Sequence, residues 1–154
     1  MCIRDRVKRL RKVIPSITFA VEVNQQFHRE KAYVPRWDIG ADNVGVEKIE
    51  EIIIAPALKI LARCQNGELS SDQMLEIATK ELSGIATVTH SNSTDSLLEI
   101  SAPGVSKGAT LARMAGRLGL TADDCVTFGD NPNDFLCSLG QAALGRWQMD
   151  ILIY

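Results

Sequence analysis

The sequence lacks the long apolar run of a membrane protein and the basic excess of a nucleic-acid-binding protein. Its 154 residues carry a net charge of −2, and 45% of them are hydrophobic. The apolar stretch Ile52–Ala55 is far too short to cross a bilayer, which takes about 20 residues. The mild acidity argues against a nucleic-acid partner. We therefore expect one or two small globular units that bind neither membrane nor nucleic acid.

Paired cysteines are also missing. The four cysteines, Cys2, Cys64, Cys125 and Cys137, show no spacing typical of a disulfide framework or a zinc site. Cys64 and Cys125 lie in apolar runs that resemble buried strands, which favours reduced thiols and a cytoplasmic protein. A disulfide or a soft-metal site is the minor alternative. The sequence contains neither internal repeats nor low-complexity segments.

The sequence does contain the patterns of strands and helices, which alternate up to about residue 103. The pattern predicts helices over residues 7–14 and 47–54 and a helix capped by the Ser70–Gln73 box, with strands over residues 17–23, 27–33, 57–62, 85–90 and 97–102. We expect residues 17–23 to be half-buried, because apolar side chains alternate there. This order predicts an α+β domain, an antiparallel sheet with helices on one face.

His90 and the serines that follow it allow two interpretations. A Ser–His catalytic pair needs a nucleophile, a base and an orienting acid that converge in space. These residues instead fall between two predicted strands, which favours a polar hairpin turn.

The segment Val105-Ser106-Lys107-Gly108 opens a predicted helix that runs to about Leu118. Ser106 is a suitable N-cap, so Lys107 and the first backbone N–H groups would point together at an anion. The apolar face of this helix comprises Leu111, Met114, Ala115 and Leu118. A lysine on a helix is more often a solvated surface charge, and the phosphate-binding interpretation depends on the motif that follows.

That motif is Gly129-Asp130-Asn131-Pro132-Asn133-Asp134, after a predicted buried strand over residues 125–128. Asn131 suits an N-cap and Pro132 a first helical turn. Two carboxylates and an amide at the carboxyl end of a strand are hard oxygen ligands suited to Mg²⁺. The same residues are also ordinary turn formers. Lys107, one helix upstream, favours a site for phosphate and magnesium.

The two motifs together resemble the C-terminal half of the haloacid dehalogenase-like phosphohydrolases of the Cof type, which carry a large α/β cap. The family has Gly-Val-Ser-Lys-Gly followed, one helix and one strand later, by Gly-Asp-x-x-Asn-Asp. Residues 98–134 contain both segments in this order. The resemblance implies an α/β protein, with a cap over residues 1–103 and a partial Rossmann-like core over residues 104–135.

The resemblance also implies the chemistry. Lys107 would hold the substrate phosphoryl group and Asn133 would contact phosphate. Asp130 would ligate Mg²⁺, and Asp134 would support the metal site without ligating the ion directly. The parent protein would hydrolyse small phosphorylated metabolites such as sugar phosphates. A phosphomutase of the same superfamily and a non-catalytic ligand-binding or interaction module are the alternatives, and the oligomeric state stays open.

The chain departs from the family in three places. The family's nucleophile, an Asp-x-Asp segment, is absent, so we expect the chain to be inactive alone. Residues 1–6 resemble a translated sequencing adapter and are expected to be non-native. From residue 136 the family's pattern is lost, whereas permitted codons restore it in another reading frame, which predicts a frameshift near Phe135 and a non-native tail over residues 136–154.

Overall fold

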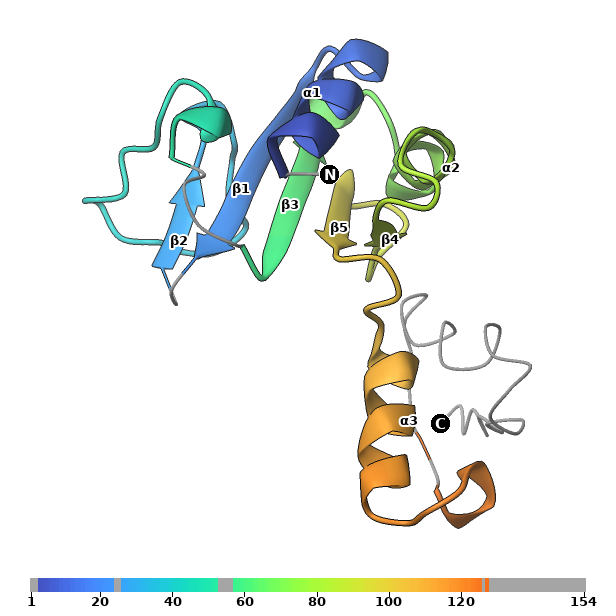
Figure 1. Ribbon diagram of the computed structural model, residues 1–154. Helices are drawn as coiled ribbons and strands as arrows, with labels where there is room; N and C mark the ends of the chain where they lie inside the picture. The colour runs from blue at the N-terminus through green and yellow to red at the C-terminus, as the bar shows by residue number, and fades with distance from the viewer. Residues whose placement is uncertain (1–2, 24–25, 53–56, 126, 128–154) are drawn as a thin grey trace. The chain divides into compact units, whose positions relative to one another are not determined.

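The computed structural model of the chain describes residues 3–23, 26–52, 57–125 and 127. The chain divides into two compact units, residues 1–103 (unit 1) and residues 104–154 (unit 2). The units are drawn together in Figure 1 and are described here one at a time. Their interpretation as a cap and a partial core stays a prediction.

Unit 1 contains two α-helices and five strands within its described residues. The helices are α1 (Ile3–Val13) and α2 (Ser71–Glu81), and the strands are β1 (Ile17–Val23), β2 (Gln26–Arg29), β3 (Lys59–Cys64), β4 (Thr87–Thr89) and β5 (Leu97–Ser101). Two 3-10 helices, η1 (Ile49–Glu51) and η2 (Gln65–Gly67), lie in the connections. In unit 2 the structure describes α3 (Lys107–Arg117) and η3 (Ala122–Asp124).

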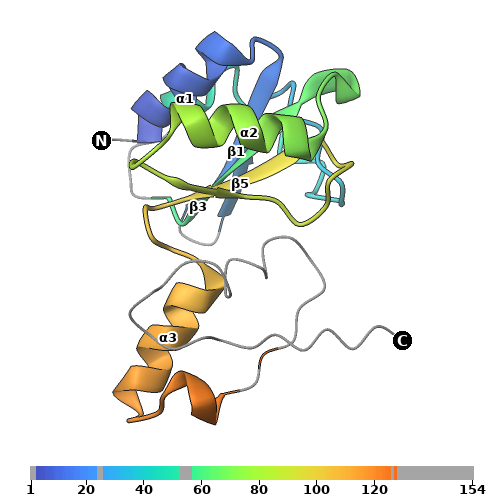
Figure 2. The same ribbon diagram turned by 90° about the vertical axis from the view of Figure 1, so that its right-hand side faces the viewer.

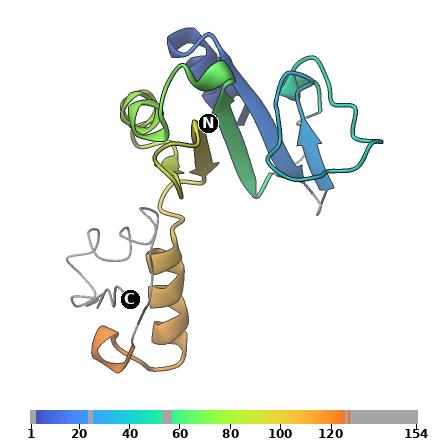
Figure 3. The same ribbon diagram turned by 180° about the vertical axis from the view of Figure 1, so that it is seen from behind.

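The five strands form one sheet in the order β2-β1-β3-β5-β4, and each strand is antiparallel to its neighbours. Both α-helices lie on the same face of this sheet, as Figure 2 shows. The segment between β2 and η1 folds back beside β2 at one edge (Figure 3). The predicted antiparallel sheet with helices on one face is confirmed for unit 1.

The hydrophobic core lies between the sheet and the two helices. In register across the central strands, Phe19 stands opposite Ala62 and Val21 opposite Ile60, so apolar side chains from neighbouring strands share one face. The buried helix residues that meet this face are Val7 and Leu10 of α1, with Met74 and Ala78 of α2 and Leu82 at its end. Burying one large apolar side chain stabilises the fold by about 1.5–3 kcal/mol.

The prediction that the first helix begins at Val7 is wrong, because α1 begins at Ile3. Ile3 precedes Val7 by four residues and therefore lies on the same helical face, where it packs partly buried against the core. The helix ends before Pro15, as expected, since the residue before a proline disfavours helical geometry.

The strand predictions need several corrections. β3 spans Lys59–Cys64 and β4 spans Thr87–Thr89, whereas the pattern predicts residues 57–62 and 85–90. β1 is not half-buried, because Thr18 and Ala20 on its second face are buried as well. β2 ends at Arg29, four residues before the predicted end, and the chain then turns so that Tyr33 N bonds to Glu30 O. For both β1 and β2 the cause is the segment after β2. Its contacts with β1 are not encoded in the strand pattern.

The predicted helix over residues 47–54 is also wrong in kind. The structure has only η1, a single 3-10 turn whose N-cap Lys48 has an extended backbone. Residues 53–56 lie outside the described part. The Ile49 N–H of this turn donates to the buried Glu30 carboxylate, a contact from a distant segment that favours a short turn at this place.

The helix α2 follows its prediction closely. Ser70 Oγ accepts a hydrogen bond from Gln73 N at 3.2 Å, and Ser70 N donates to Gln73 Oε1 at 2.9 Å. This reciprocal capping box satisfies two N–H groups that the helix itself leaves unpaired. The pattern predicted both the box and the inner face, of which Met74, Ala78 and Leu82 are fully buried.

Candidate functional site

The described part of the candidate site is the start of α3 in unit 2. Ser106 has an extended backbone and accepts a hydrogen bond from Ala109 N at 3.1 Å through its side chain, which makes it the predicted N-cap. Lys107 is therefore the first helical residue. The helix ends at its cap residue Leu118, and Gly119 follows with a φ of +72°, a conformation that glycine adopts without strain.

This arrangement concentrates positive potential at one point. The N–H groups of a first helical turn have no acceptor within the helix itself, and the positive end of the helix dipole lies there, here at the start of the 11 residues of α3. Lys107 adds a full positive charge at the same end, and no acidic residue lies in this turn. The start of α3 thus has the charge and donors to bind an anionic group.

The remaining predicted site residues, Asp130, Asn133 and Asp134, lie outside the described residues. Of the predicted strand over residues 125–128, the structure describes Cys125 and Thr127 only. Whether Lys107 and these side chains meet is therefore untested, and their roles stay predictions. Within the described residues, no group of three or more His, Cys, Asp or Glu side chains could hold a metal ion.

Between α3 and that strand, the chain forms η3, which the sequence analysis did not predict. Asp124 accepts hydrogen bonds from both Thr121 N and Thr121 Oγ1 at 2.8 Å. These two bonds, the backbone one first, lower the pKa of the Asp124 carboxyl. The Thr121-x-x-Asp124 spacing is itself a capping pattern and could have revealed this turn.

His90 and the serines after it lie in the connection between the antiparallel strands β4 and β5, so the hairpin interpretation is confirmed. The His90 side chain is buried, and its Nε2 lies 2.8 Å from Asp72 Oδ1 at the start of α2. Ser91 donates instead to Glu99 Oε1 at 3.2 Å. The histidine thus pairs with an acid rather than with a serine nucleophile. The pair links the residue that follows β4 to the first turn of α2, and no spacing in the sequence predicts this contact.

The cysteines and the helices give two further findings. Cys64 and Cys125, the cysteines whose positions are described, are both free thiols. Among the described residues, none of the helices combines the length and the apolar character needed to span a bilayer.

Comparison with known proteins identifies a family. The sequence model of the haloacid dehalogenase-like hydrolases matches residues 25–136, which is more than half of the chain. The match includes Lys107 and the whole Gly-Asp-x-x-Asn-Asp segment.

Several solved structures have a similar fold. SMU.1108c from Streptococcus mutans UA159 has a TM-score of 0.63 and 18% identity over 86% of this chain and 50% of its own. A haloacid dehalogenase-like hydrolase from B. subtilis has a TM-score of 0.57 and 18% identity over 88% of this chain and 57% of its own.

A third structure is the subclass IIB sugar phosphatase BT4131, with a TM-score of 0.59 and 9% identity over 85% of this chain and 48% of its own. The chain therefore spans about half the length of these proteins.

Proposed function

Since this chain belongs to the haloacid dehalogenase-like hydrolases, we propose that it is part of a Mg²⁺-dependent phosphomonoester hydrolase acting on small phosphorylated metabolites such as sugar phosphates. The observation that carries this proposal is the capped start of α3, where Lys107 and the first-turn N–H groups form a cationic end inside the matched region. The similarity in fold to a sugar phosphatase supports the substrate class.

Each residue has a physical task in this proposal. Lys107 holds the phosphoryl group and offsets the negative charge that accumulates on its oxygens in the transition state. Ser106 fixes the first turn, because its side chain bonds Ala109 N. Asn133 orients a phosphate oxygen through its amide.

The donor set fits Mg²⁺, a hard cation that binds through one or two carboxylates plus water and phosphate. Asp130 would hold the ion, and Asp134 would orient that carboxylate. When bound, the ion supplies electrostatic stabilisation of the phosphate oxygens.

The proposal extends to what this chain cannot do alone. Covalent phosphoryl transfer needs a carboxylate nucleophile, and the sequence contains no Asp-x-Asp segment to supply it. Lys107, Asp130 and Asn133 bind phosphate and metal but offer no nucleophile. The 154-residue chain should therefore bind phosphate without turning over a phosphomonoester.

The proposed change of reading frame lies near Phe135, and the family match stops at residue 136. This coincidence supports a tail over residues 136–154 that derives from another frame. Sequencing the genomic locus would test it directly. An intact frame that encodes residues 136–154 as printed would contradict the proposal.

Activity is tested with p-nitrophenyl phosphate and Mg²⁺. A gene repaired at residue 135 and extended upstream to an Asp-x-Asp segment should hydrolyse this substrate, and Asp130→Asn in the repaired protein should abolish turnover. The 154-residue chain is the matched negative control. Turnover by this chain that Asp130→Asn removes would overturn the fragment interpretation. If the genomic sequence has no Asp-x-Asp upstream, the non-catalytic ligand-binding module becomes the better proposal.

A further inference from the structure

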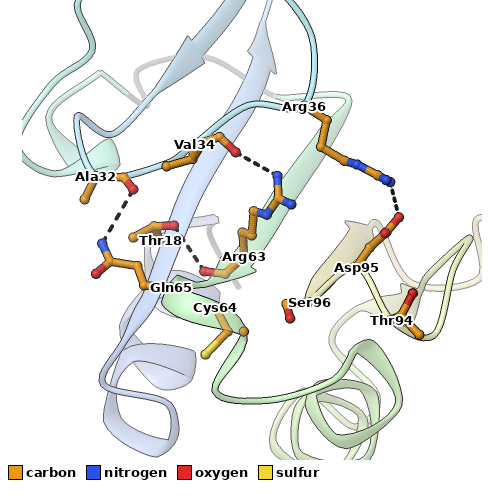
Figure 4. A pocket seen from close by; sticks show the side chains of 11 residues that line it. Thr18, Ala32, Val34, Arg36, Arg63, Cys64, Gln65, Thr94, Asp95 and Ser96 are labelled. Atoms are coloured by element: carbon orange, nitrogen blue, oxygen red, sulfur yellow. Dashed lines mark hydrogen bonds and ion pairs between the residues drawn. The ribbon is translucent and has the colours of Figure 1, made fainter.

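Unit 1 contains a pocket of about 620 Å³ at the end of the sheet where β3 finishes and β5 begins. Such a volume falls within the range of about 300–1,000 Å³ typical of small-molecule sites. Four separate chain segments line it, and Figure 4 shows the side chains that they contribute. The lining includes Thr18 from β1, Val34 and Arg36 from the segment after β2, Arg63 from β3, and Asp95 and Ser96 before β5.

Arg63 contributes several of the hydrogen-bond donors that line the pocket. Its Nη1 donates to Val34 O at 2.7 Å, and this is the one hydrogen bond that its guanidinium makes within the described part of the chain. An arginine side chain has five N–H donors in a planar fork, so several remain for a ligand. Arg63 stands beside Thr18 and Leu97 in register, which places it on the face of the sheet opposite the helices.

Arg36 approaches from the other side of the pocket. Its guanidinium forms an ion pair with Asp95, whose side chain is only 14% exposed, whereas the arginine side chain is 50% exposed. Figure 4 shows the two arginines on different segments of the chain, with the Arg36 guanidinium directed at Asp95. The ion pair leaves part of the Arg36 fork unused, because a carboxylate can accept from only one edge of it.

The backbone at the rim is held in an uncommon conformation. Ser96 is buried and has a φ of +52°, in the left-handed region that residues other than glycine adopt only at a cost in strain. Its carbonyl accepts a hydrogen bond from Cys64 N at 3.1 Å, which ties the rim to the end of β3. This hydrogen bond holds the residue next to Asp95 against the end of β3.

The charges of the lining are unequal, with two arginines against one aspartate. We propose that this pocket binds a small molecule through an oxyanion group, a phosphate or a carboxylate, held between Arg63 and Arg36. A planar carboxylate and a tetrahedral phosphate both have several oxygens, and either can accept two N–H groups from the same guanidinium. Asp95 acts as the internal competitor, occupying Arg36 until the ligand arrives.

This proposal goes beyond the hydrolase function and does not depend on it. All the residues that it uses lie in unit 1, whereas the phosphate and metal residues proposed above lie in unit 2. Either proposal could therefore fail while the other stands.

The test is titration of the 154-residue chain with two probes, inorganic phosphate and malonate, at constant ionic strength, followed by calorimetry and by the arginine Nε–H resonances in NMR spectra. We expect saturable binding of at least one probe with a shift of the Arg63 resonance. Phosphate alone would indicate a phosphate-bearing ligand, and malonate alone a carboxylate-bearing one. If neither probe saturates, the proposal is overturned.

Substitutions of opposite sign sharpen the test. Arg63→Gln should weaken binding about tenfold or more, since it removes hydrogen bonds between oppositely charged groups. Arg36→Gln should weaken it as well, and it keeps the proposal testable if Arg63→Gln fails to fold. Asp95→Asn should strengthen binding, because it releases Arg36 and removes a repelling charge.

Two controls locate the site. Arg9→Gln changes the net charge by the same amount on α1, where Arg9 lies near Glu81 and away from the pocket lining, and it should leave binding unchanged. Lys107→Gln should also leave unchanged the binding that shifts the Arg63 Nε–H resonance. Loss of that site in Lys107→Gln, or weaker binding in Asp95→Asn, would overturn the proposal.

Discussion

Glu30 is a buried carboxylate that joins three elements of unit 1. Its Oε2 accepts from Phe19 N at 3.0 Å and its Oε1 from Ile49 N at 2.8 Å, and Arg11 of α1 forms an ion pair with it. Only 3% of its side chain is exposed. A buried charge is tolerated where hydrogen bonds and an opposite charge satisfy it, and here both are present.

Glu30→Gln should therefore destabilise the protein strongly. The amide would turn an N–H₂ group toward backbone donors and would leave Arg11 with one partner fewer, a loss of about 3 kcal/mol. Urea denaturation followed by circular dichroism measures the free energy of unfolding. Glu47→Gln is the matched control, because Glu47 pairs with Lys31 in a largely exposed position, where solvent screens the charges and the pair contributes little to stability. Equal effects of the two variants would contradict this role for Glu30.

Glu50 binds the same arginine from a second side. Arg11 Nε and Nη2 lie 3.3 and 3.2 Å from its two carboxylate oxygens, a forked arrangement. Burial by itself raises the pKa of Glu50, but the hydrogen bond and the charge of Arg11 outweigh it and hold that pKa below the ordinary value of 4.5. The folded state thus favours the ionised form.

The resulting prediction concerns pH. A carboxyl group whose pKa is lowered by folding contributes stability above its unfolded pKa and loses that contribution as the pH falls through the folded value. The difference in unfolding free energy between the unchanged protein and Glu50→Gln should be constant near neutral pH and should shrink below about 4.5. Denaturant titrations across this range check it. A difference that grows toward acid pH would give the wrong sign and exclude the assignment.

At the scale of elements, the Ser70–Gln73 capping box permits a local test. Ser70→Ala removes the acceptor for Gln73 N and should lower the free energy of unfolding by about 1 kcal/mol. Ser83→Ala is the control, because Ser83 is an exposed residue just beyond the end of the same helix and should change stability by less than about 0.5 kcal/mol. If both variants behave alike, the box does not stabilise α2.

The elements that the sequence predicts well are those whose signals are local. The cap, the periodicity and the inner face of α2 all depend on residues close together in the sequence, and β1 has the predicted bounds. The early end of β2 and the 3-10 turn η1 depend on Glu30, which receives bonds from residues up to 19 positions away. Contacts of this kind arise only in the folded chain, so no local pattern encodes them.

The candidate site also has a part that local signals predict, while the pocket depends on contacts between distant residues. Ser106 as an N-cap was predictable, because capping is a property of one turn, and the structure confirms it. The pocket between Arg36 and Arg63 was not predicted, since its four lining segments are scattered from β1 to β5 and meet only through the sheet order. Neither arginine belongs to a motif, and the sequence offers no signal that they converge.

At the scale of the whole molecule, the notable element is α3, because much of its predicted apolar face is exposed. The sequence predicts an apolar face with Met114 and Leu118, yet these side chains are 56% and 72% exposed. Of the predicted face, only Ala115 is buried. Periodicity shows which face of a helix can pack, but it does not show that a partner is present. The chain spans about half the length of similar solved structures, so such a partner belongs to our proposal for the parent protein.

Hydrogen exchange tests this proposal on the whole chain. An isolated helix of 11 residues is marginal in water, since nucleation is costly and most helical stability comes from packing. Amides of α3 should therefore exchange about a hundredfold or more faster than those of β3, which lies between two strands in the centre of the sheet.

In the repaired full-length protein, the added core residues should cover Met114 and Leu118 and slow exchange in α3, while β3 serves as the internal control. Equal protection of α3 and β3 in the 154-residue chain would mean that the helix needs no further partner. In that case exposed apolar side chains such as Leu118 would not indicate a missing packing partner. The exposed face of α3 would then no longer support the fragment interpretation.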